Sequence, residues 1–395
     1  MNAPASGLAA PCEGERLARS ALSRVFEPGE PKTGALLRTG GAEALLERLR
    51  TGGAAPKGFT KGRWEALTVR ARRADPERDL ARAAAVGGRF VCPGDLEWPS
   101  QLDDLQDTRP LGLWVRGPAD LRMWSLRAVA IVGARACTDY GTYLAGALAV
   151  GLAEQGWVVV SGGAFGIDGA AHRGALGVAG GTLAVLACGI DRSYPPGHAR
   201  LLARIAEQGL LVGELPPGEH PTPSRFVTRN RVIAALTRGT VVVEAALRSG
   251  ALVTARAAER LGRHVMGVPG PATSGLSAGV HQLLRGQAHL VTDAAEVVEL
   301  VGEMGELAPE RRGPLVPRDL LSPEAAVVLA ALPAHGVVPA ESIALAAVTA
   351  KDDVIARLYE LQALGFVERH GDGWQLTRRT RTTASPGWER GGHAR

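Results

Sequence analysis

Short apolar runs bounded by glycine recur through the middle of the chain. They occupy residues 128–132, 157–160, 183–187, 210–212, 240–243 and 265–268. Each run is rich in β-branched residues and lacks the alternation of a half-exposed strand, which is typical of strands buried on both faces of a parallel sheet. Helix-compatible stretches such as 140–155 and 198–208 separate the runs. The pattern predicts an open, doubly wound, mainly parallel α/β domain whose ligands bind beyond the carboxyl ends of the strands.

The flanking segments predict two smaller domains. Residues 1–86 predict a helical module with a flexible start; its apolar segments around Thr39-Gly40-Gly41 suit either a helix-hairpin-helix that grips DNA or a SAM-like helical adaptor. A charged linker at 306–318 precedes three helical patterns and a hairpin with a Gly-Asp-Gly turn. That order predicts a winged helix over 319–378, followed by a flexible polar tail at 379–395.

Composition narrows the function classes. The 395 residues carry a net charge of +5, with 51 glycines and 25 prolines, and arginine outnumbers the acidic residues between 161 and 263. A basic balance of this kind suits an acidic partner. The four cysteines have no metal-ligand spacing, so the sequence predicts neither a metal nor a cofactor. No apolar stretch approaches ~18 residues and no signal pattern begins the chain, which predicts a cytoplasmic protein without a membrane partner.

The run from Phe226 to Leu236 is the most informative ligand-site candidate. Arg229, Asn230 and Arg231 stand at the start of an apolar, helix-compatible stretch. A helix N-terminus attracts anions through its free N–H groups and its dipole, and arginine adds bidentate phosphate donors. The alternative is an arginine-rich helix start that is solvated or paired with Glu244.

Further phosphate-holding groups follow other strands of the predicted sheet. Glycine lets backbone amides approach a ligand closely, and hydroxyl groups add donors. The glycine-rich loop after the second run does not have the G-x-G-x-x-G spacing of dinucleotide enzymes. The candidate groups are Gly133 and Arg135 after the first run, Ser161, Gly162, Gly163, Phe165 and Gly166 after the second, and Ser249, Gly250 and Thr254 after the fifth.

Other polar residues near these loops allow structural or functional interpretations. Asp168 either caps a helix or contacts ligand, His172 either packs in the core or acts as a base, and Tyr194 either packs or stacks on a base. Glu244 is placed to orient Arg229 or Arg231. The loops contain no nucleophile with its base and no carboxylate pair, which favours binding over catalysis.

The ordered set of motifs resembles the DNA-processing protein A (DprA/Smf) family over about residues 96–305. The resemblance is carried by Val132-Gly133-Ala134-Arg135, Ser161-Gly162-Gly163-Ala164-Phe165-Gly166-Ile167-Asp168 with His172, Tyr194-Pro195, Phe226 with Arg229-Asn230-Arg231, residues 244–255, and Val268-Pro269-Gly270. It implies an extended Rossmann-like domain that binds single-stranded DNA, forms a homodimer and loads RecA recombinase during natural transformation or recombination.

The resemblance also implies roles for individual residues. Arg135, the 161–166 loop and the segment 229–231 become a phosphate clamp, with Ser249, Gly250 and Thr254 as supporting donors. Phe226 becomes a base-stacking face. Phe165 and Pro196 stand where basic residues are frequent in the family, which puts the strength of the backbone grip in question.

Two other function classes remain open at this point. A Rossmann-like nucleotide hydrolase of the phosphoribohydrolase type would use the same phosphate cradle, although residues 243–250 lack its glycine-rich motif. A transcriptional regulator would read duplex DNA with the winged helix. Its recognition helix, however, begins Lys351-Asp352-Asp353 and carries Glu360, and carboxylates repel phosphates. Contact with protein, or weak contact with duplex DNA through residues 369–373, is the alternative.

Overall fold

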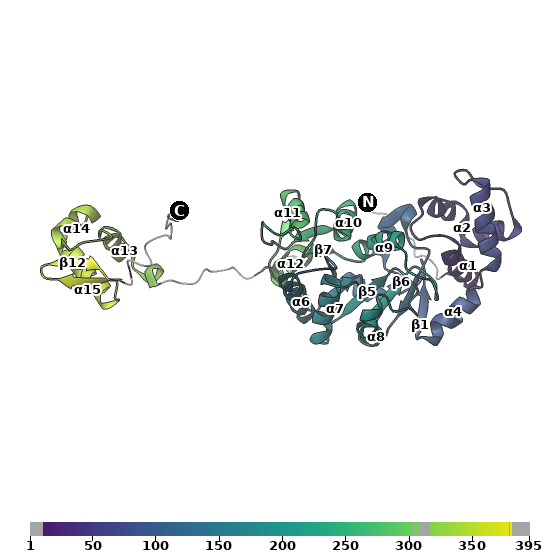
Figure 1. Cartoon of the computed structure of the whole chain (residues 1–395), viewed down its shortest axis with the longest axis horizontal. Helices are drawn as coiled ribbons and strands as arrows, with labels where there is room; N and C mark the ends of the chain where they lie inside the picture. The colour runs from purple at the N-terminus through teal and green to yellow at the C-terminus, as the bar shows by residue number, and fades with distance from the viewer. Residues whose placement is uncertain (1–10, 304, 309–316, 379, 381–395) are drawn as a thin grey trace, which may run out of the picture. The chain divides into compact units, whose positions relative to one another are not determined.

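The central element is a nine-stranded sheet with the strand order β1-β2-β6-β5-β4-β3-β7-β8-β9 (Figure 1). Neighbouring strands from β6 to β9 are parallel, whereas β1 and β2 extend the sheet in antiparallel pairing. The strands are β1 (Gly88–Val91), β2 (Leu113–Arg116), β3 (Ala128–Val132), β4 (Val158–Ser161), β5 (Thr182–Leu186), β6 (Leu210–Gly213), β7 (Gly239–Val242), β8 (His264–Gly267) and β9 (His289–Leu290).

The computed structural model describes residues 11–303, 305–308, 317–378 and 380, and it divides into two units, Met1–Pro309 and Glu310–Arg395. The sheet lies in the first unit. The predicted mainly parallel α/β fold is confirmed, and each of the predicted apolar runs forms a strand within about one residue of its expected position. Strands β1, β2 and β9 were not predicted, because two- to four-residue segments at a sheet edge carry little hydrophobic pattern.

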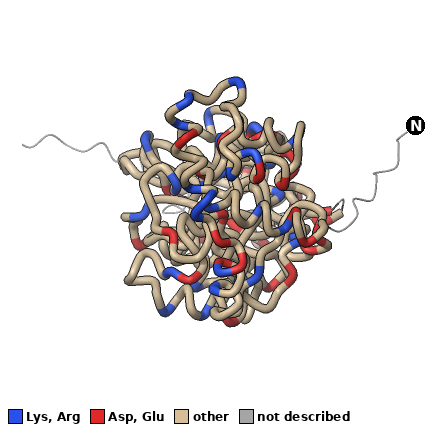
Figure 2. Tube along the Cα trace, turned by 90° about the vertical axis from the view of Figure 1, so that its right-hand side faces the viewer, with Lys and Arg blue, Asp and Glu red and all other residues tan. Residues whose placement is uncertain are grey.

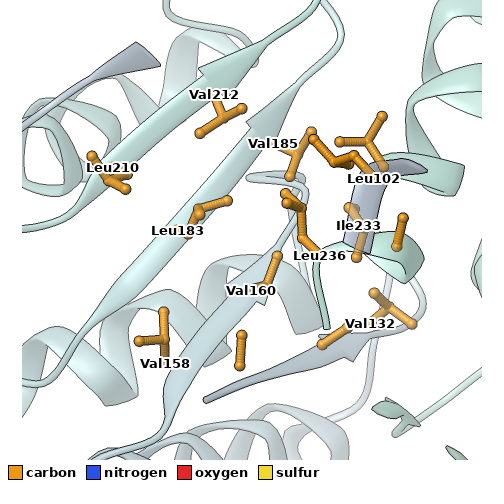
Figure 3. Close-up of a cluster of buried hydrophobic side chains, with 14 of the residues drawn as sticks. Leu102, Val132, Val158, Val160, Leu183, Val185, Leu210, Val212, Ile233 and Leu236 are labelled. Atoms are coloured by element: carbon orange, nitrogen blue, oxygen red, sulfur yellow. The ribbon is translucent and has the colours of Figure 1, made fainter. Parts of the chain in front are cut away.

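Helices cover both faces of this sheet. Val129 and Ile131 of β3 pack with α6, α7 and α12, whereas the alternate residues Ala130 and Val132 pack with η1, α9, α10 and α11. Figure 3 shows part of the core on the face of Ala130 and Val132, where Ile233 of α9 packs against valines and leucines of the strands. The elements are η1 (Ser100–Thr108), α5 (Leu121–Leu126), α6 (Asp139–Glu154), α7 (Ile167–Gly177), η2 (Pro196–His198), α8 (Ala199–Gln208), α9 (Pro223–Ala235), α10 (Gly250–Arg260), α11 (Ala278–Arg285) and α12 (Ala294–Val301).

The chain reverses its direction of winding between β3 and β7. After β3 it proceeds outward through β4, β5 and β6, and then returns to place β7 on the other side of β3. The helices that follow these two neighbours, α6 and α10, therefore leave toward opposite faces of the sheet. Such a reversal opens a crevice at the carboxyl ends of the two strands, which is where open α/β sheets bind ligands.

Four helices form the N-terminal module of the first unit: α1 (Glu13–Val25), α2 (Pro31–Thr51), α3 (Lys61–Arg73) and α4 (Pro76–Ala85). Leu22, Leu49 and Trp64 are fully or almost fully buried among them. Gly41, with φ 78° and ψ 170°, interrupts α2, so that two helical segments meet at a kink within the expected turn at residues 39–41. Only glycine adopts such a backbone readily. The helix-hairpin-helix and SAM-like interpretations of this module both stay predictions.

The second unit has its own core and a three-stranded sheet of order β10-β12-β11. Its elements are η3 (Pro317–Leu320), α13 (Pro323–Ala330), β10 (Val338–Pro339), α14 (Ala340–Ala347), α15 (Lys351–Ala363), β11 (Val367–His370) and β12 (Gly373–Leu376). They match the expected three helices and hairpin, while the winged-helix assignment stays a prediction. The expected flexible start, most of the linker at 306–318 and almost all of the tail at 379–395 lie outside the described residues. Within the described part of the chain, no helix has the length and apolar character to span a bilayer.

Candidate functional site

A cleft of about 700 Å³ lies at the carboxyl ends of β3 and β7, where the winding reverses. Its walls come from the loops after these strands and from one side of α9. It contains most of the candidate residues predicted from the sequence. The polar and aromatic residues that line it are Arg135, Asp168, Tyr194, Thr222, Phe226, Arg229, Asn230, Arg248, Ser249 and Thr254, together with Gly133 and Gly250.

Arg229 is the buried cation of this cleft. Its side chain is 6% exposed, and its Nε and Nη1 atoms have no hydrogen-bond partner among the described residues. Burial lowers its pKa to about 10; Asp168 raises the pKa and Arg135 lowers it further. The guanidinium therefore remains protonated at neutral pH. A buried charge without hydrogen-bond partners is costly unless a ligand supplies the missing acceptor.

Gly162 provides the space that this guanidinium occupies. A Cβ atom built on Gly162 would overlap the Nη1 and Nη2 atoms of Arg229. The same loop turns sharply at Gly166, which has φ 75°, and a side chain there would meet the backbone carbonyls of Ala134 and Arg135. The glycines thus bring the second loop against the first and against α9, which is a packing role.

Two amides of the glycine-rich loop, where a phosphate cradle is predicted, are engaged within the chain. The N–H groups of Gly162 and Ala164 both donate to Oδ2 of Asp168, at 3.1 and 3.4 Å. Burial raises the pKa of the Asp168 carboxyl, while Arg229 and the two amides lower it. The Ser161 hydroxyl is also occupied, because it donates to the carbonyl of Ile131 at 2.7 Å. An internal carboxylate therefore takes two of the donors that the predicted cradle would offer to a ligand.

The segment 229–231 lies in the middle of a helix rather than at its N-terminus. Helix α9 begins at Pro223, and the Thr222 side chain caps it by accepting from the amide of Arg225. The dipole of α9 therefore adds nothing to anion binding by Arg229, since the attraction of the dipole for anions is confined to the first turn of a helix. The helix that does begin in the cleft is α10, whose N-cap is Ser249 and whose first residue, Gly250, is exposed.

Arg231 does not face the cleft. Its Nη1 and Nη2 atoms donate to the two carboxylate oxygens of Glu214 at 2.6 and 2.7 Å, and its Nε donates to the carbonyl of Thr108 at 2.9 Å. The predicted clamp position of Arg231 is therefore corrected to a buried ion pair. Asn230, by contrast, lines the cleft and donates to the carbonyl of Gly250 at 3.2 Å, which links α9 to the start of α10.

An aromatic and guanidinium stack forms one wall of the cleft. The Arg135 guanidinium lies 4.8 Å from the centroid of the Phe226 ring, and the Tyr194 ring lies 5.5 Å from Phe226 on a tilted plane. Tyr194 remains 41% exposed. Phe165 is outside this stack; it is 47% exposed and packs edge-on against His198 at 4.7 Å. The wall offers flat faces on which an unpaired base can stack.

Arg248 is a residue of the cleft that was not predicted from the sequence. Arg248 is exposed, lines the cleft and directly precedes the N-cap residue Ser249. Neither Arg248 nor Arg135 forms an ion pair with a described residue, so both guanidinium groups are available to a ligand. Both residues can be recognised in the sequence by their position, because each arginine follows a buried strand and precedes the start of a helix.

Glu244 has a structural role that the sequence did not indicate. It is 2% exposed, and its oxygens accept from the amide and the hydroxyl of Thr138 at 2.9 and 2.6 Å. It therefore fixes the start of α6 and does not orient Arg229 or Arg231. Among the described residues lining the cleft, Asp168 is the single carboxylate, and it is already engaged with amides.

His172 packs in the core beneath the glycine-rich loop. Its Nδ1 lies 2.7 Å from the Thr182 hydroxyl, which itself donates to the carbonyl of Val159, so His172 donates to Thr182. Burial lowers the pKa of His172 to about 3, with positive neighbours adding to the effect. This is the structural interpretation of His172 rather than the catalytic one.

The His172 environment predicts a specific acid sensitivity. A histidine that is neutral when folded stabilises the fold above its unfolded pKa of ~6.5, and this stability is lost as the pH falls toward about 3. In His172→Gln, which keeps a donor for Thr182 but does not titrate, the free energy of unfolding should fall less steeply between pH 6 and 4. The expected difference is up to about 1.4 kcal/mol per pH unit. Urea unfolding at each pH measures it, and equal slopes for both proteins would contradict the assignment.

Comparison with known proteins relates this cleft to a protein family. The DNA recombination-mediator protein A family matches residues 89–302. A putative DNA processing protein DprA from Mycobacterium tuberculosis is 45% identical over 374 residues, covering 90% of this chain and 93% of the relative. The protein Smf of Escherichia coli is 37% identical over 301 residues, covering 73% of this chain and 78% of the relative. The X-ray structure of DNA processing protein A from Streptococcus pneumoniae aligns with a TM-score of 0.62 and 30% identity, over 74% of this chain and 99% of that structure.

Proposed function

Because the chain belongs to the DNA recombination-mediator protein A family, we propose that it binds single-stranded DNA in the cleft and delivers the strand to a RecA-type recombinase. In this proposal the protein binds without catalysis and works as a homodimer that spans a longer strand. The proposed role is DNA processing in natural transformation or recombination, and recombination is the context that the family description supplies.

The observation that carries the proposal is the composition of the cleft. Three arginines line it, beside the exposed ring of Tyr194 and the half-buried ring of Phe226. One of the three, Arg229, is buried and has no hydrogen-bond partner for its Nε and Nη1 among the described residues. Guanidinium groups hold phosphates, and aromatic faces stack bases whatever their identity. A cleft built from these two components suits a nucleic-acid strand with little sequence preference.

The aromatic wall favours a single strand over a duplex. Bases in a duplex are stacked on one another, so their faces are not accessible to Tyr194 or Phe226. Major-groove recognition would instead require a helix or a two-stranded ribbon that enters the groove. The cleft is concave and lies between loops, where an extended strand can reach Arg229.

Fluorescence anisotropy with labelled single-stranded and duplex oligonucleotides of equal length, over a salt series, tests the proposal. We expect preferential single-strand binding, and Arg248→Ala should reduce the slope of log affinity against log salt by about 0.7 for one lost phosphate contact. The matched control is Arg260→Ala. Arg260 is an exposed arginine at the C-terminal end of α10, the helix that Arg248 precedes, and its loss should leave the slope unchanged. Preference for duplex DNA, or equal slopes for Arg248→Ala and the wild-type protein, would contradict the proposal.

We do not propose a nucleotide hydrolase. Its acid–base carboxylate would be Glu244, and the two hydrogen bonds from Thr138 already engage that side chain. Turnover of a nucleoside monophosphate that is lost in Glu244→Gln would overturn this choice. The second unit is not proposed as a sequence-specific reader, because Asp352 and Asp353 occupy the first turn of α15.

A further inference from the structure

Helix α9 presents two different sets of residues to two different surroundings. Phe226, Arg229 and Asn230 line the cleft. Arg225, Thr228 and Arg231, spaced three residues apart, form a separate row along the helix and contact the connection between α1 and α2 or the loops beside it. The helix that supplies the cleft with its buried cation therefore also contacts the N-terminal module.

Arg225 joins α9 to the module through charge. Its Nε and Nη2 atoms donate to the two oxygens of Glu27, both at 2.9 Å, and its Nη1 donates to Glu219 at 3.0 Å. Glu219 in turn accepts from Arg24 of α1 at 3.2 Å. The Arg225 side chain is only 11% exposed, whereas Glu27 is 51% exposed, and the bidentate geometry of the pair fixes direction as well as distance.

Gly29 joins the module to α9 through backbone packing. This residue has φ 71°, and a Cβ atom built on it would lie 2.8 Å from Nε of Arg231 and 2.9 Å from Cγ2 of Thr228. Arg231 cannot yield easily, because Glu214 holds its guanidinium in a bidentate pair. The module backbone thus rests directly on the row 225, 228 and 231.

The contacts with α9 are the feature that relates the module to the cleft. Figure 2 views the molecule from the side on which α1 to α4 lie, where Lys and Arg positions lie beside Asp and Glu positions. The pair between Arg225 and Glu27 and the close approach of Gly29 to Arg231 join this side to α9.

We propose that the α1–α4 module sets the position of α9 and thereby the affinity of the cleft for single-stranded DNA. Arg225 and Arg231 are positioning residues in this arrangement. Because the described residues give Nε and Nη1 of Arg229 no hydrogen-bond partner, the backbone of α9 determines where its charge lies. The inference rests on the proposed function and adds a coupling between module and cleft, which must act equally in both directions.

A pair of glycine variants in the full-length chain tests the coupling. Gly29→Ala should weaken single-strand binding by about fivefold or more, since coupling between sites is commonly of that size. The matched control is Gly58→Ala in the same module. Gly58 also has positive φ, 96°, but a Cβ there meets only the Lys32 side chain at 3.7 Å. Both variants therefore carry backbone strain, and only Gly29→Ala disturbs α9. Glu27→Gln, which removes charge without strain, should weaken binding by roughly twofold.

Hydrogen exchange gives a second measurement. If the module had only a structural role, DNA binding would leave the exchange rates of its amides unchanged. Saturating oligonucleotide should slow exchange of the amides of Thr33 and Gly34, which donate to the carbonyl of Glu30 beside the contact with α9. Equal binding by Gly29→Ala and wild type, or equal weakening by both glycine variants, would overturn the inference. Failure of the wild-type chain to bind single strands would instead overturn the proposed function, and the positioning role with it.

Discussion

Replacing Arg229 with methionine is expected to weaken single-strand binding by about a hundredfold while changing the stability of the fold much less. A buried hydrogen-bonded charge contact contributes about 2–3 kcal/mol to binding. In the free protein, the Nε and Nη1 of the buried guanidinium have no partner among the described residues, so an apolar side chain of similar length removes a desolvation cost. The loss of its favourable charge beside Asp168 acts in the opposite direction and offsets part of this gain. Anisotropy titration and urea unfolding of the same preparation measure the two effects.

The control for this variant is Arg238→Met. Arg238 is also partly buried in the first unit, but it donates to the carbonyl of Val301 and lies over Trp157, at the opposite end of the strands from the cleft. Its loss should leave DNA affinity unchanged. If Arg229→Met bound DNA as tightly as the wild-type protein, the buried cation would have a structural role and the phosphate clamp would be reduced to Arg135 and Arg248.

The second large effect is expected from Gly162→Ala. The added methyl group would overlap the Arg229 guanidinium, and overpacking of this kind destabilises a fold by about 1–3 kcal/mol. The same displacement should reduce DNA binding. The control is Gly177→Ala at the end of α7, where a Cβ meets nothing within 4 Å and alanine favours the helix.

A double-mutant cycle separates this steric contact from a general loss of stability. When Arg229 is also replaced by alanine, the space beside Gly162 is vacated, so Gly162→Ala should then cost almost nothing in free energy of unfolding. DNA binding should stay low in the double variant, because the cation is gone. Additive costs in the cycle would show that the methyl group at position 162 clashes with another part of the chain.

The sheet and the place of the cleft could be predicted because their signals are local or topological. Strands such as 128–132 and 240–243 are buried on both faces, so each appears as an unbroken apolar run. In a doubly wound sheet, ligands bind beyond the carboxyl ends of the strands. The runs therefore predicted which edge of the sheet binds the ligand, and Arg135 follows the first run. Thr222 followed by Pro223 also marks the start of α9, although the helix was predicted to begin later.

The roles of individual polar groups could not be predicted, because their partners are distant in sequence. Arg231 pairs with Glu214 and Glu244 bonds to Thr138, contacts that only the tertiary structure creates. The Ser161 hydroxyl and the amides of Gly162 and Ala164 resemble part of a phosphate cradle in sequence, yet they already donate to Ile131 and Asp168. A donor counts toward a ligand site only when the folded chain leaves it unused, and Arg229 is the candidate for which this condition holds most clearly.

The unequal edges of the sheet have a consequence for solubility. At one edge, β9 is two residues long, which leaves almost no backbone ladder for a foreign strand to extend. At the other edge, Arg16 of α1 donates to the carbonyl of Phe90 in β1 at 2.9 Å, and α4 packs beside the strand. Long uncovered edges recruit other chains into aggregates. Truncation of the helical module would expose β1, so the shortened protein should precipitate at concentrations that the full chain tolerates.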